Sequence, residues 1–141
     1  MSRFTDELDP RFCPLAMELL SQSELAGVPL RVIDMLRTPE EQDVNLANGT
    51  SWTKNTLHLP QPCCGKSHAI DVCPIALLPK KGWAPGHRDW HIVGAIGRKL
   101  GLKWGVWKKN AQGVLVNVDW GHLEYVEPLR SDITIATMGE S

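Results

Sequence analysis

The most informative stretch of this 141-residue sequence is residues 119–124, which read Asp-Trp-Gly-His-Leu-Glu. Here a carboxylate, Asp119, stands three residues before a histidine, His122. Such a pair can supply a metal ligand and a base that holds a water molecule. Upstream segments add two further ligand types, in His58 and Asp71. We therefore predict that His58, Asp71 and His122 bind one zinc ion, with Asp119 as the base beside it.

The predicted set meets the needs of a catalytic zinc site. Such a site has three protein ligands and keeps a fourth position for water, whose pKa the metal lowers toward neutrality. A carboxylate that does not bind the metal must also take the proton of the water and pass it to the leaving amine. The plainer alternatives are that Asp71 faces solvent from a strand and that Asp119 caps backbone N–H groups in a turn.

Composition limits the class of protein. A chain of 141 residues with 43% hydrophobic residues predicts one globular domain over residues 1–141. Fifteen basic and sixteen acidic residues leave a net charge of −1, which gives no basis for nucleic-acid binding. No apolar run has the length of a signal peptide or a membrane span. We therefore expect a cytoplasmic monomer that needs neither nucleic acid nor membrane.

The elements that must position these residues follow from hydrophobic periodicity and turn residues. We predict helices at about 10–26, 38–48 and 88–100, and strands at about 30–36, 67–73, 102–107, 114–118 and 122–126. Residues 49–66 form a long loop, and residues 130–141 form a tail. This order predicts an α+β domain with a small, mostly antiparallel sheet, flanking helices and the zinc site at the sheet edge.

Five segments extend the pattern over residues 30–126. In chain order they are Leu-Arg-Thr-Pro-Glu-Glu-Gln (36–42), Thr-Leu-His (56–58), Gly-Lys-Ser-His-Ala-Ile-Asp (65–71), Gly-Leu-Lys-Trp-Gly-Val-Trp (101–107) and residues 119–124. Together they resemble the zinc peptidase family that includes D-alanyl-D-alanine carboxypeptidases, vancomycin-resistance dipeptidases and phage L-alanyl-D-glutamate endopeptidases. The second Trp of the fourth segment comes one residue earlier than in that family.

The resemblance implies the same zinc ligands and the same base as above, and it adds residues around them. Arg37 would stabilise the oxyanion of the tetrahedral intermediate, an effect on the order of several kcal/mol. Gln42 would brace the site, and Glu124 would orient a zinc-binding histidine. The plainer alternative for Arg37 is a surface ion pair with Glu40 or Glu41.

The resemblance also implies a substrate. Thr56 would bind a substrate carboxylate. Tryptophans are more often part of the core, but Trp104 and Trp120 lie closest to the motifs and are expected to wall the cleft. The expected activity is hydrolysis of the peptidoglycan stem peptide at the L-alanyl-D-glutamate bond, by a phage endolysin held in the host cytoplasm until its release to the wall at lysis. The alternatives are a D-alanyl-D-alanine carboxypeptidase and a wall-peptide binding module without catalysis.

The interval between His58 and Asp71 is longer than the compact His-x6-Asp form and is similar to that of a subgroup of phage endolysin domains. His68 is a competing ligand, but residues three apart on a strand face opposite sides, so it should not share a metal with Asp71. Without an export signal the four cysteines are expected to be thiols. Another arrangement is a structural zinc knuckle that combines Cys63, Cys64 and Cys73 with His58 or His68, although the spacing lacks the Cys-x2-Cys signature.

Overall fold

The computed structural model describes residues 3–37, 40, 47 and 57–127. Of the helix predicted at 38–48, only residues 40 and 47 are therefore described. The tail at 130–141, Gln42 and Thr56 lie outside the described residues.

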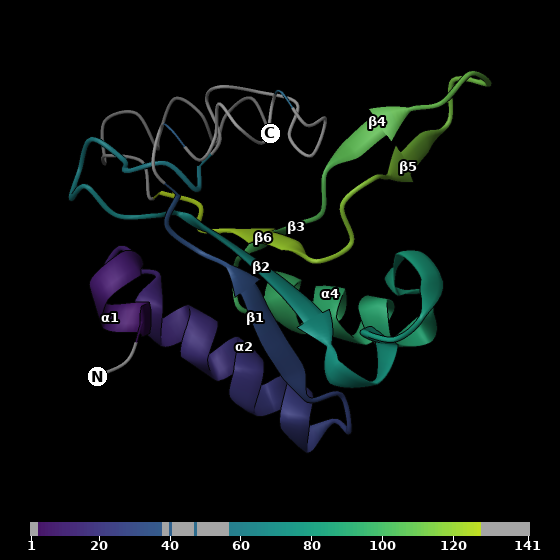
Figure 1. Ribbon diagram of the computed structural model, residues 1–141, viewed down its shortest axis with the longest axis horizontal. Helices are drawn as coiled ribbons and strands as arrows, with labels where there is room; N and C mark the ends of the chain where they lie inside the picture. The colour runs from purple at the N-terminus through teal and green to yellow at the C-terminus, as the bar shows by residue number, and fades with distance from the viewer. Residues whose placement is uncertain (1–2, 38–39, 41–46, 48–56, 128–141) are drawn as a thin grey trace, which may run out of the picture.

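The described chain folds into helices that flank a small antiparallel sheet (Figure 1). The helices are α1 (Arg3–Glu7), α2 (Cys13–Leu25) and α4 (Arg88–Lys99), with the 3-10 turns η1 (Ile75–Leu77) and η2 (Lys81–Trp83). The strands are β1 (Leu30–Asp34), β2 (Ala69–Pro74), β3 (Lys103–Trp104), β4 (Trp107–Lys109), β5 (Leu115–Asn117) and β6 (His122–Glu124). The prediction of an α+β domain is confirmed. No helix among these is long and apolar enough to cross a bilayer.

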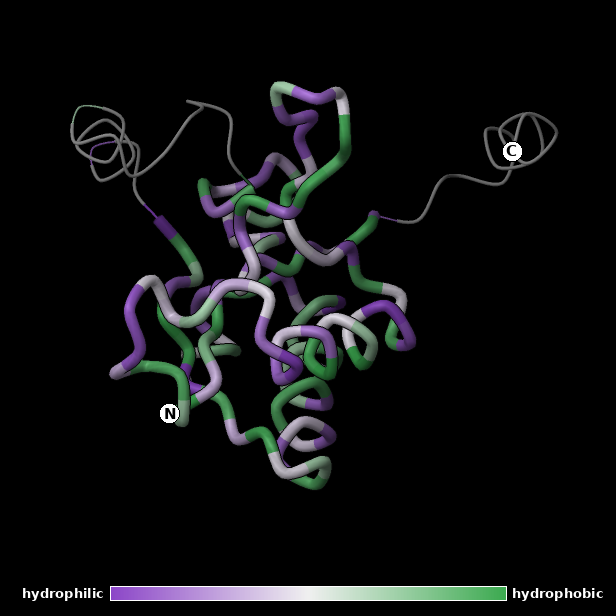
Figure 2. Tube along the Cα trace, turned by 90° about the vertical axis from the view of Figure 1, so that its right-hand side faces the viewer, coloured by the Kyte–Doolittle hydropathy of each residue, from purple (hydrophilic) through white to green (hydrophobic). Residues whose placement is uncertain are grey.

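The main sheet has the order β1-β2-β6-β3, and every neighbouring pair in it is antiparallel. Strands β4 and β5 form a separate hairpin that projects away from this sheet (Figure 1). Figure 2 shows hydrophobic β5 beside hydrophilic β4 in this hairpin, at the top of the view. The main sheet thus carries the core, and the hairpin is an appendage to it.

Alternation along the central strands separates the core from the opposite face of the sheet. Ile70, Val72 and Leu123 are fully buried and belong to one cluster with residues of α2 and α4. Because side chains alternate along a strand, Asp71 and His122 project to the other face. The hydrophobic face of the sheet thereby fixes which polar side chains share the second face.

The strand predicted at 102–107 is wrong as a single element. Gly105 has φ +79°, a left-handed conformation that favours glycine. Its N–H donates to the carbonyl of His122 at 2.7 Å, and the chain then turns out of the sheet. The segment is therefore split into β3 and β4, and β4 pairs with β5 outside the main sheet.

Helix α4 packs very closely on the sheet because two of its residues that face the sheet are glycines. A Cβ built on Gly94 would lie 2.4 Å from two indole carbons of Trp104, and one on Gly97 would lie 2.3 Å from a methyl carbon of Leu123. The Trp104 ring has little room to retreat, because its Nε1 donates to the carbonyl of Trp120 at 2.8 Å.

We predict that Gly94→Ala destabilises the fold. At an exposed helical site alanine would stabilise by about 1 kcal/mol over glycine, but overpacking of this kind costs about 1–3 kcal/mol. Chemical denaturation should show a lower free energy of unfolding. Ala95→Ser, on the exposed side of the same helix, is the control and should change it by less than about 0.5 kcal/mol. An unchanged or raised value for Gly94→Ala would contradict the packing described.

Candidate metal centre and cleft

Two of the predicted ligands face each other across the central strand pair. Asp71 of β2 is the direct partner of His122 of β6 in the antiparallel register. Side chains at such positions leave the same face, with Cβ atoms about 4.5–5.5 Å apart. His122 Nδ1 lies 3.0 Å from Asp71 Oδ1. Sheet register alone therefore brings a carboxylate and an imidazole together.

His58 reaches the same point from the loop before β2. Its carbonyl accepts the N–H of Arg37 at 2.7 Å, and the carbonyl of the preceding Leu57 accepts the N–H of His68 at 3.0 Å. His58 is buried, and its Nε2 lies 3.1 Å from Asp71 Oδ2. One donor atom each from His58, Asp71 and His122 lie within 4.8 Å of one another. The structure brings all three predicted ligands together.

The hydrogen bonds behind the two imidazoles leave one ring nitrogen of each for a metal. His58 Nδ1 lies 2.7 Å from the carbonyl oxygen of Met35, which can only accept, so Nδ1 carries the hydrogen and Nε2 is the nitrogen that faces Asp71. His122 Nε2 lies 2.8 Å from Glu124 Oε1, which leaves Nδ1 directed at Asp71. Metal-binding histidines commonly have such a carboxylate or carbonyl partner on the second nitrogen.

The electrostatics of this centre favour positive charge. Burial on its own would lower the pKa of His122, but the carboxylates of Asp71 and Glu124 outweigh it and raise that pKa to about 10. Burial likewise works to raise the pKa of Asp71, yet hydrogen bonds to His122 and His58 hold it well below its usual range. A proton on His122 or a bound metal ion can supply the positive charge that neutralises these carboxylates. Two imidazoles and one carboxylate form a donor set that fits zinc.

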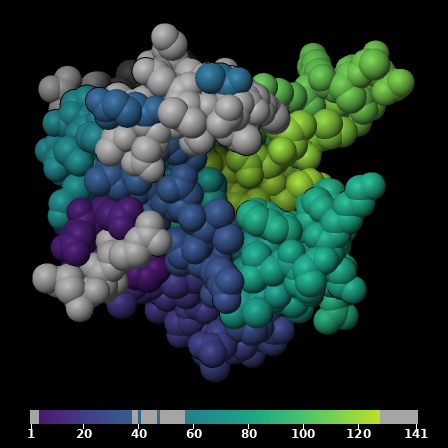
Figure 3. Space-filling model, viewed as in Figure 1, coloured from purple at the N-terminus to yellow at the C-terminus, as the bar shows by residue number. Residues whose placement is uncertain are grey.

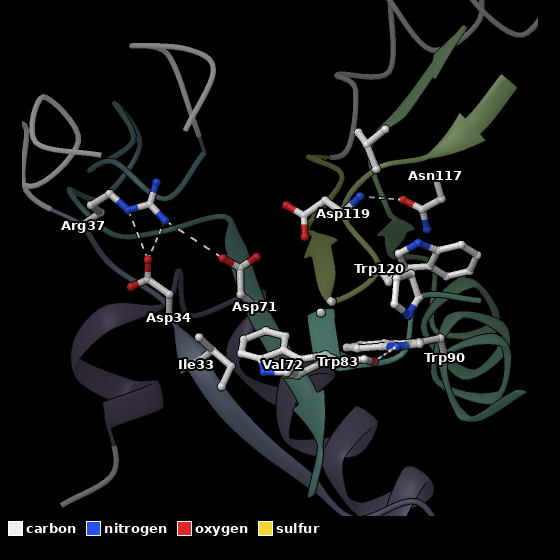
Figure 4. A pocket seen from close by; sticks show the side chains of 14 residues that line it. Ile33, Asp34, Arg37, Asp71, Val72, Trp83, Trp90, Asn117, Asp119 and Trp120 are labelled. Carbon is white, nitrogen blue, oxygen red and sulfur yellow. Dashed lines mark hydrogen bonds and ion pairs between the residues drawn. The ribbon is translucent and has the colours of Figure 1, made fainter. Parts of the chain in front are cut away.

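Asp119 lies close to the centre without belonging to the cluster of three donor atoms. Burial and the negative charge of Asp71 raise its pKa to about 6, against the opposing effects of His122, His58 and Arg37. Figure 4 shows the carboxylates of Asp71 and Asp119 on facing sides of the cleft. A carboxyl group that titrates close to neutrality suits proton transfer.

Arg37 reaches the centre because of a bulge in β1. Val32 pairs with Val72 and Asp34 pairs with Asp71, so Ile33 is an extra residue in the strand. The bulge turns Asp34 to the side of Asp71. Arg37 Nη2 lies 2.5 Å from Asp34 Oδ2 and 4.0 Å from Asp71 Oδ2 (Figure 4).

Asn117 is a residue of the site that the sequence analysis missed. Its Oδ1 accepts the backbone N–H groups of Val106 and Asp119, each at 3.1 Å. Asn117 thereby fixes the turn that presents the Asp119 carboxylate. The missed signal was the ability of asparagine to bond the backbone two residues on, which is typical of a turn.

The centre opens into a cleft of about 910 Å³. Figure 3 shows a notch in the surface between the projecting hairpin and the segment that contains η2. Trp120 lines the cleft, as does Trp83, which the sequence analysis did not assign to it. Trp104 is buried behind Trp120, bonded to its carbonyl, and is not among the described residues that line the cleft.

Gly121 holds the turn before β6 against β2. A Cβ at this position would lie 2.2 Å from the carbonyl oxygen of Val72, and the carbonyl of Gly121 accepts the N–H of Val72 at 2.9 Å. A side chain could not be accommodated there without moving backbone. Glycine therefore allows Asp119 and His122 to approach Asp71.

Comparisons with known proteins identify a shared architecture. No protein-family model matches the sequence, and no curated protein matches it. The fold is similar to that of a solved structure, the L-Ala D-Glu endopeptidase ChiX from Serratia marcescens, with a TM-score of 0.56 and 21% sequence identity. The match covers 86% of this chain and 82% of ChiX. The chain thus shares the fold of that solved structure and carries, on that fold, a cluster of side chains that could hold a metal ion.

We predict that Glu124→Ala weakens zinc binding by about 10–100-fold, the usual effect of removing a carboxylate behind a metal-binding histidine. Competition with a chromophoric chelator measures this affinity. Glu18→Ala, an exposed carboxylate on α2, is the matched control and should leave affinity unchanged. Equal affinities for the two variants would show that Glu124 does not orient His122.

Proposed function

We propose that this chain is a zinc-dependent peptidase that cleaves the peptidoglycan stem peptide at the L-alanyl-D-glutamate bond. The observation that carries the proposal is the convergence of His58, Asp71 and His122, where Asp71 and the nearby Asp119 line an open cleft. The likeness in fold to an L-Ala D-Glu endopeptidase supports the choice of substrate. As part of the same proposal, the protein acts as a phage endolysin, held in the host cytoplasm until lysis.

Zinc would be held by Nε2 of His58, a carboxylate oxygen of Asp71 and Nδ1 of His122. When bound, zinc polarises the scissile carbonyl and lowers the pKa of a water molecule. Met35 and Glu124 keep the protons of the two rings on the nitrogens that face away from the ion. Zinc would take the place of the proton that His122 Nδ1 shares with Asp71, and each ring would then direct a lone pair to the metal position.

Asp119 performs the proton transfers. Its carboxylate accepts the proton of the attacking water and then donates it to the nitrogen of the leaving D-glutamyl residue, so no proton is gained or lost overall. Asn117 holds the backbone of Asp119 during both transfers. Burial keeps the carboxyl pKa close to that needed for giving and taking a proton near neutrality.

Arg37 would stabilise negative charge on the substrate oxygen. Asp34 fixes the guanidinium through Nε and Nη2, at 3.1 and 2.5 Å. A fixed donor stabilises a developing oxyanion without the cost of reorienting solvent. Trp120 and Trp83 offer apolar surface for the peptide. We also propose that Thr56 binds a carboxylate of the substrate and that Gln42 braces the site.

Asp119→Ala should separate catalysis from metal binding. We expect a fall in kcat of at least about 100-fold, the low end of the contribution from a general base, with zinc content unchanged. His122→Ala should instead lose the zinc ion of this centre. Hydrolysis of purified peptidoglycan and elemental analysis of the same samples measure both effects. Asp6→Ala, an exposed carboxylate on α1, should behave as the wild type. Full activity in Asp119→Ala would show that another group is the base.

The identity of the cleaved bond is read from the products on purified peptidoglycan. We expect new D-glutamate amino termini and no free D-alanine. Release of free D-alanine would show a D-alanyl-D-alanine carboxypeptidase instead. Absence of any product from the zinc-loaded protein, with retention on the wall peptide, would show a binding module.

A further inference from the structure

A second cluster of metal-ligand types lies outside the candidate catalytic centre. It consists of Asp9, Cys63, Cys64 and His68, each offering one donor atom within 4.8 Å of the others. Asp9 Oδ2 lies 2.8 Å from His68 Nε2 and 3.3 Å from Cys63 Sγ. Cys63 Sγ in turn lies 3.3 Å from His68 Nε2 and 2.8 Å from Cys64 Sγ.

We propose that Asp9, Cys63, Cys64 and His68 form a second, structural zinc site. Four protein ligands close the tetrahedron and leave no position for a reacting water, in contrast to the three-ligand centre. Thiolate donors together with an imidazole favour zinc over magnesium or calcium. Cys73, which the sequence analysis grouped with these cysteines, is fully buried in β2 and is not part of the cluster.

The buried half of the site is rigid and already in place. Asp9 and His68 are 1% and 5% exposed. The ring of His68 packs edge-on against Tyr125 with centroids 5.5 Å apart, and its carbonyl accepts the N–H of Tyr125 at 2.7 Å. The two polar side chains thus converge on one point from segments 59 residues apart in sequence.

The exposed half of the site can close over an ion. Cys63 and Cys64 are exposed, so their side chains have room to rotate. Tetrahedral zinc with Zn–S bonds of about 2.3 Å separates two sulfurs by about 3.8 Å. The two sulfurs must therefore part by roughly 1 Å from their present distance, which side-chain rotation can supply.

Bound zinc would neutralise most of the negative charge of the site. Two thiolates and the Asp9 carboxylate carry three negative charges, one more than the ion neutralises. Arg11 supplies a positive charge beside the site, since its Nη2 lies 2.7 Å from Asp9 Oδ2 and its Nε lies 3.2 Å from Asp9 Oδ1. The same Nη2 also pairs with the exposed carboxylate of Glu127 at 2.7 Å. A carboxylate can bind the metal while a guanidinium holds it in orientation.

Such a site would tie the loop that carries His58 to the N-terminal segment. Backbone hydrogen bonds already join these two segments. The N–H of Asp9 donates to the carbonyl of Ser67 at 3.1 Å, and the N–H of Ser67 donates to the carbonyl of Glu7 at 2.8 Å. Zinc would add the middle of the loop, at Cys63 and Cys64, to this contact. The binding site itself does not depend on the proposed peptidase function.

Cobalt(II) replacing zinc in the reduced 141-residue protein tests the proposal, because thiolate ligands give cobalt an intense near-ultraviolet charge-transfer band. The wild type should bind two equivalents and show the band. The double variant Cys63→Ser, Cys64→Ser should lose one equivalent and the band. Cys13→Ala, which removes a thiol outside the cluster, should keep both. His122→Ala should lose one equivalent and keep the band, so failure of the catalytic centre is told apart from failure of this one.

A second measurement needs no variant. In the zinc-loaded wild type, Cys63 and Cys64 should react with a maleimide at least tenfold more slowly than after chelation, with the modified cysteines identified by peptide mass. Absence of the charge-transfer band, or equal reactivity with and without zinc, would overturn the proposal. So would a Cys63–Cys64 disulfide, seen as the loss of two hydrogens, that persists in the protein loaded under reducing conditions.

Discussion

The antiparallel pairing of β2 with β6 is the constraint on which the candidate site depends. It sets Asp71 opposite His122. A slip of one residue would turn one of these side chains into the core. The register is held from the other face by Ile70 and Leu123, which are fully buried and are themselves paired. Hydrophobic packing on one face of the sheet thus specifies ligand geometry on the other.

The charged groups around this pair leave a net negative charge that a divalent cation could neutralise. Asp34 and Arg37 neutralise each other at one side of the cleft. Asp71 lies between two imidazoles, and Asp119 faces it from the opposite side with a raised pKa. The free energy that would otherwise be lost in burying carboxylates near one another is recovered when a cation binds between them. Local stability and metal affinity are therefore linked through the same residues.

The sequence predicts the fold class and the candidate ligands, but it does not predict the features that depend on contacts between distant segments. Short motifs predict His58, Asp71 and His122 as ligands because ligand chemistry restricts residue type and spacing, and the structure brings these three side chains together. His68 lies just before β2 and contacts Asp9 instead of Asp71. Motifs say nothing about the bulge at Ile33 that turns Asp34 and Arg37 toward the centre, because a bulge depends on the partner strand. The contact between Asp9 and His68 is likewise tertiary and leaves no local pattern.

The proposed ligand set can be checked with a crystal structure of the zinc-loaded protein, with anomalous diffraction recorded on both sides of the zinc absorption edge. We expect an anomalous peak within bonding distance, about 2.0–2.2 Å, of His58 Nε2, an Asp71 carboxylate oxygen and His122 Nδ1. The Asp119 carboxylate should lie within hydrogen-bonding reach of a water molecule on that ion. A well-ordered site without such a peak, or a zinc ion there that is bound by Asp119 in place of Asp71, would contradict it.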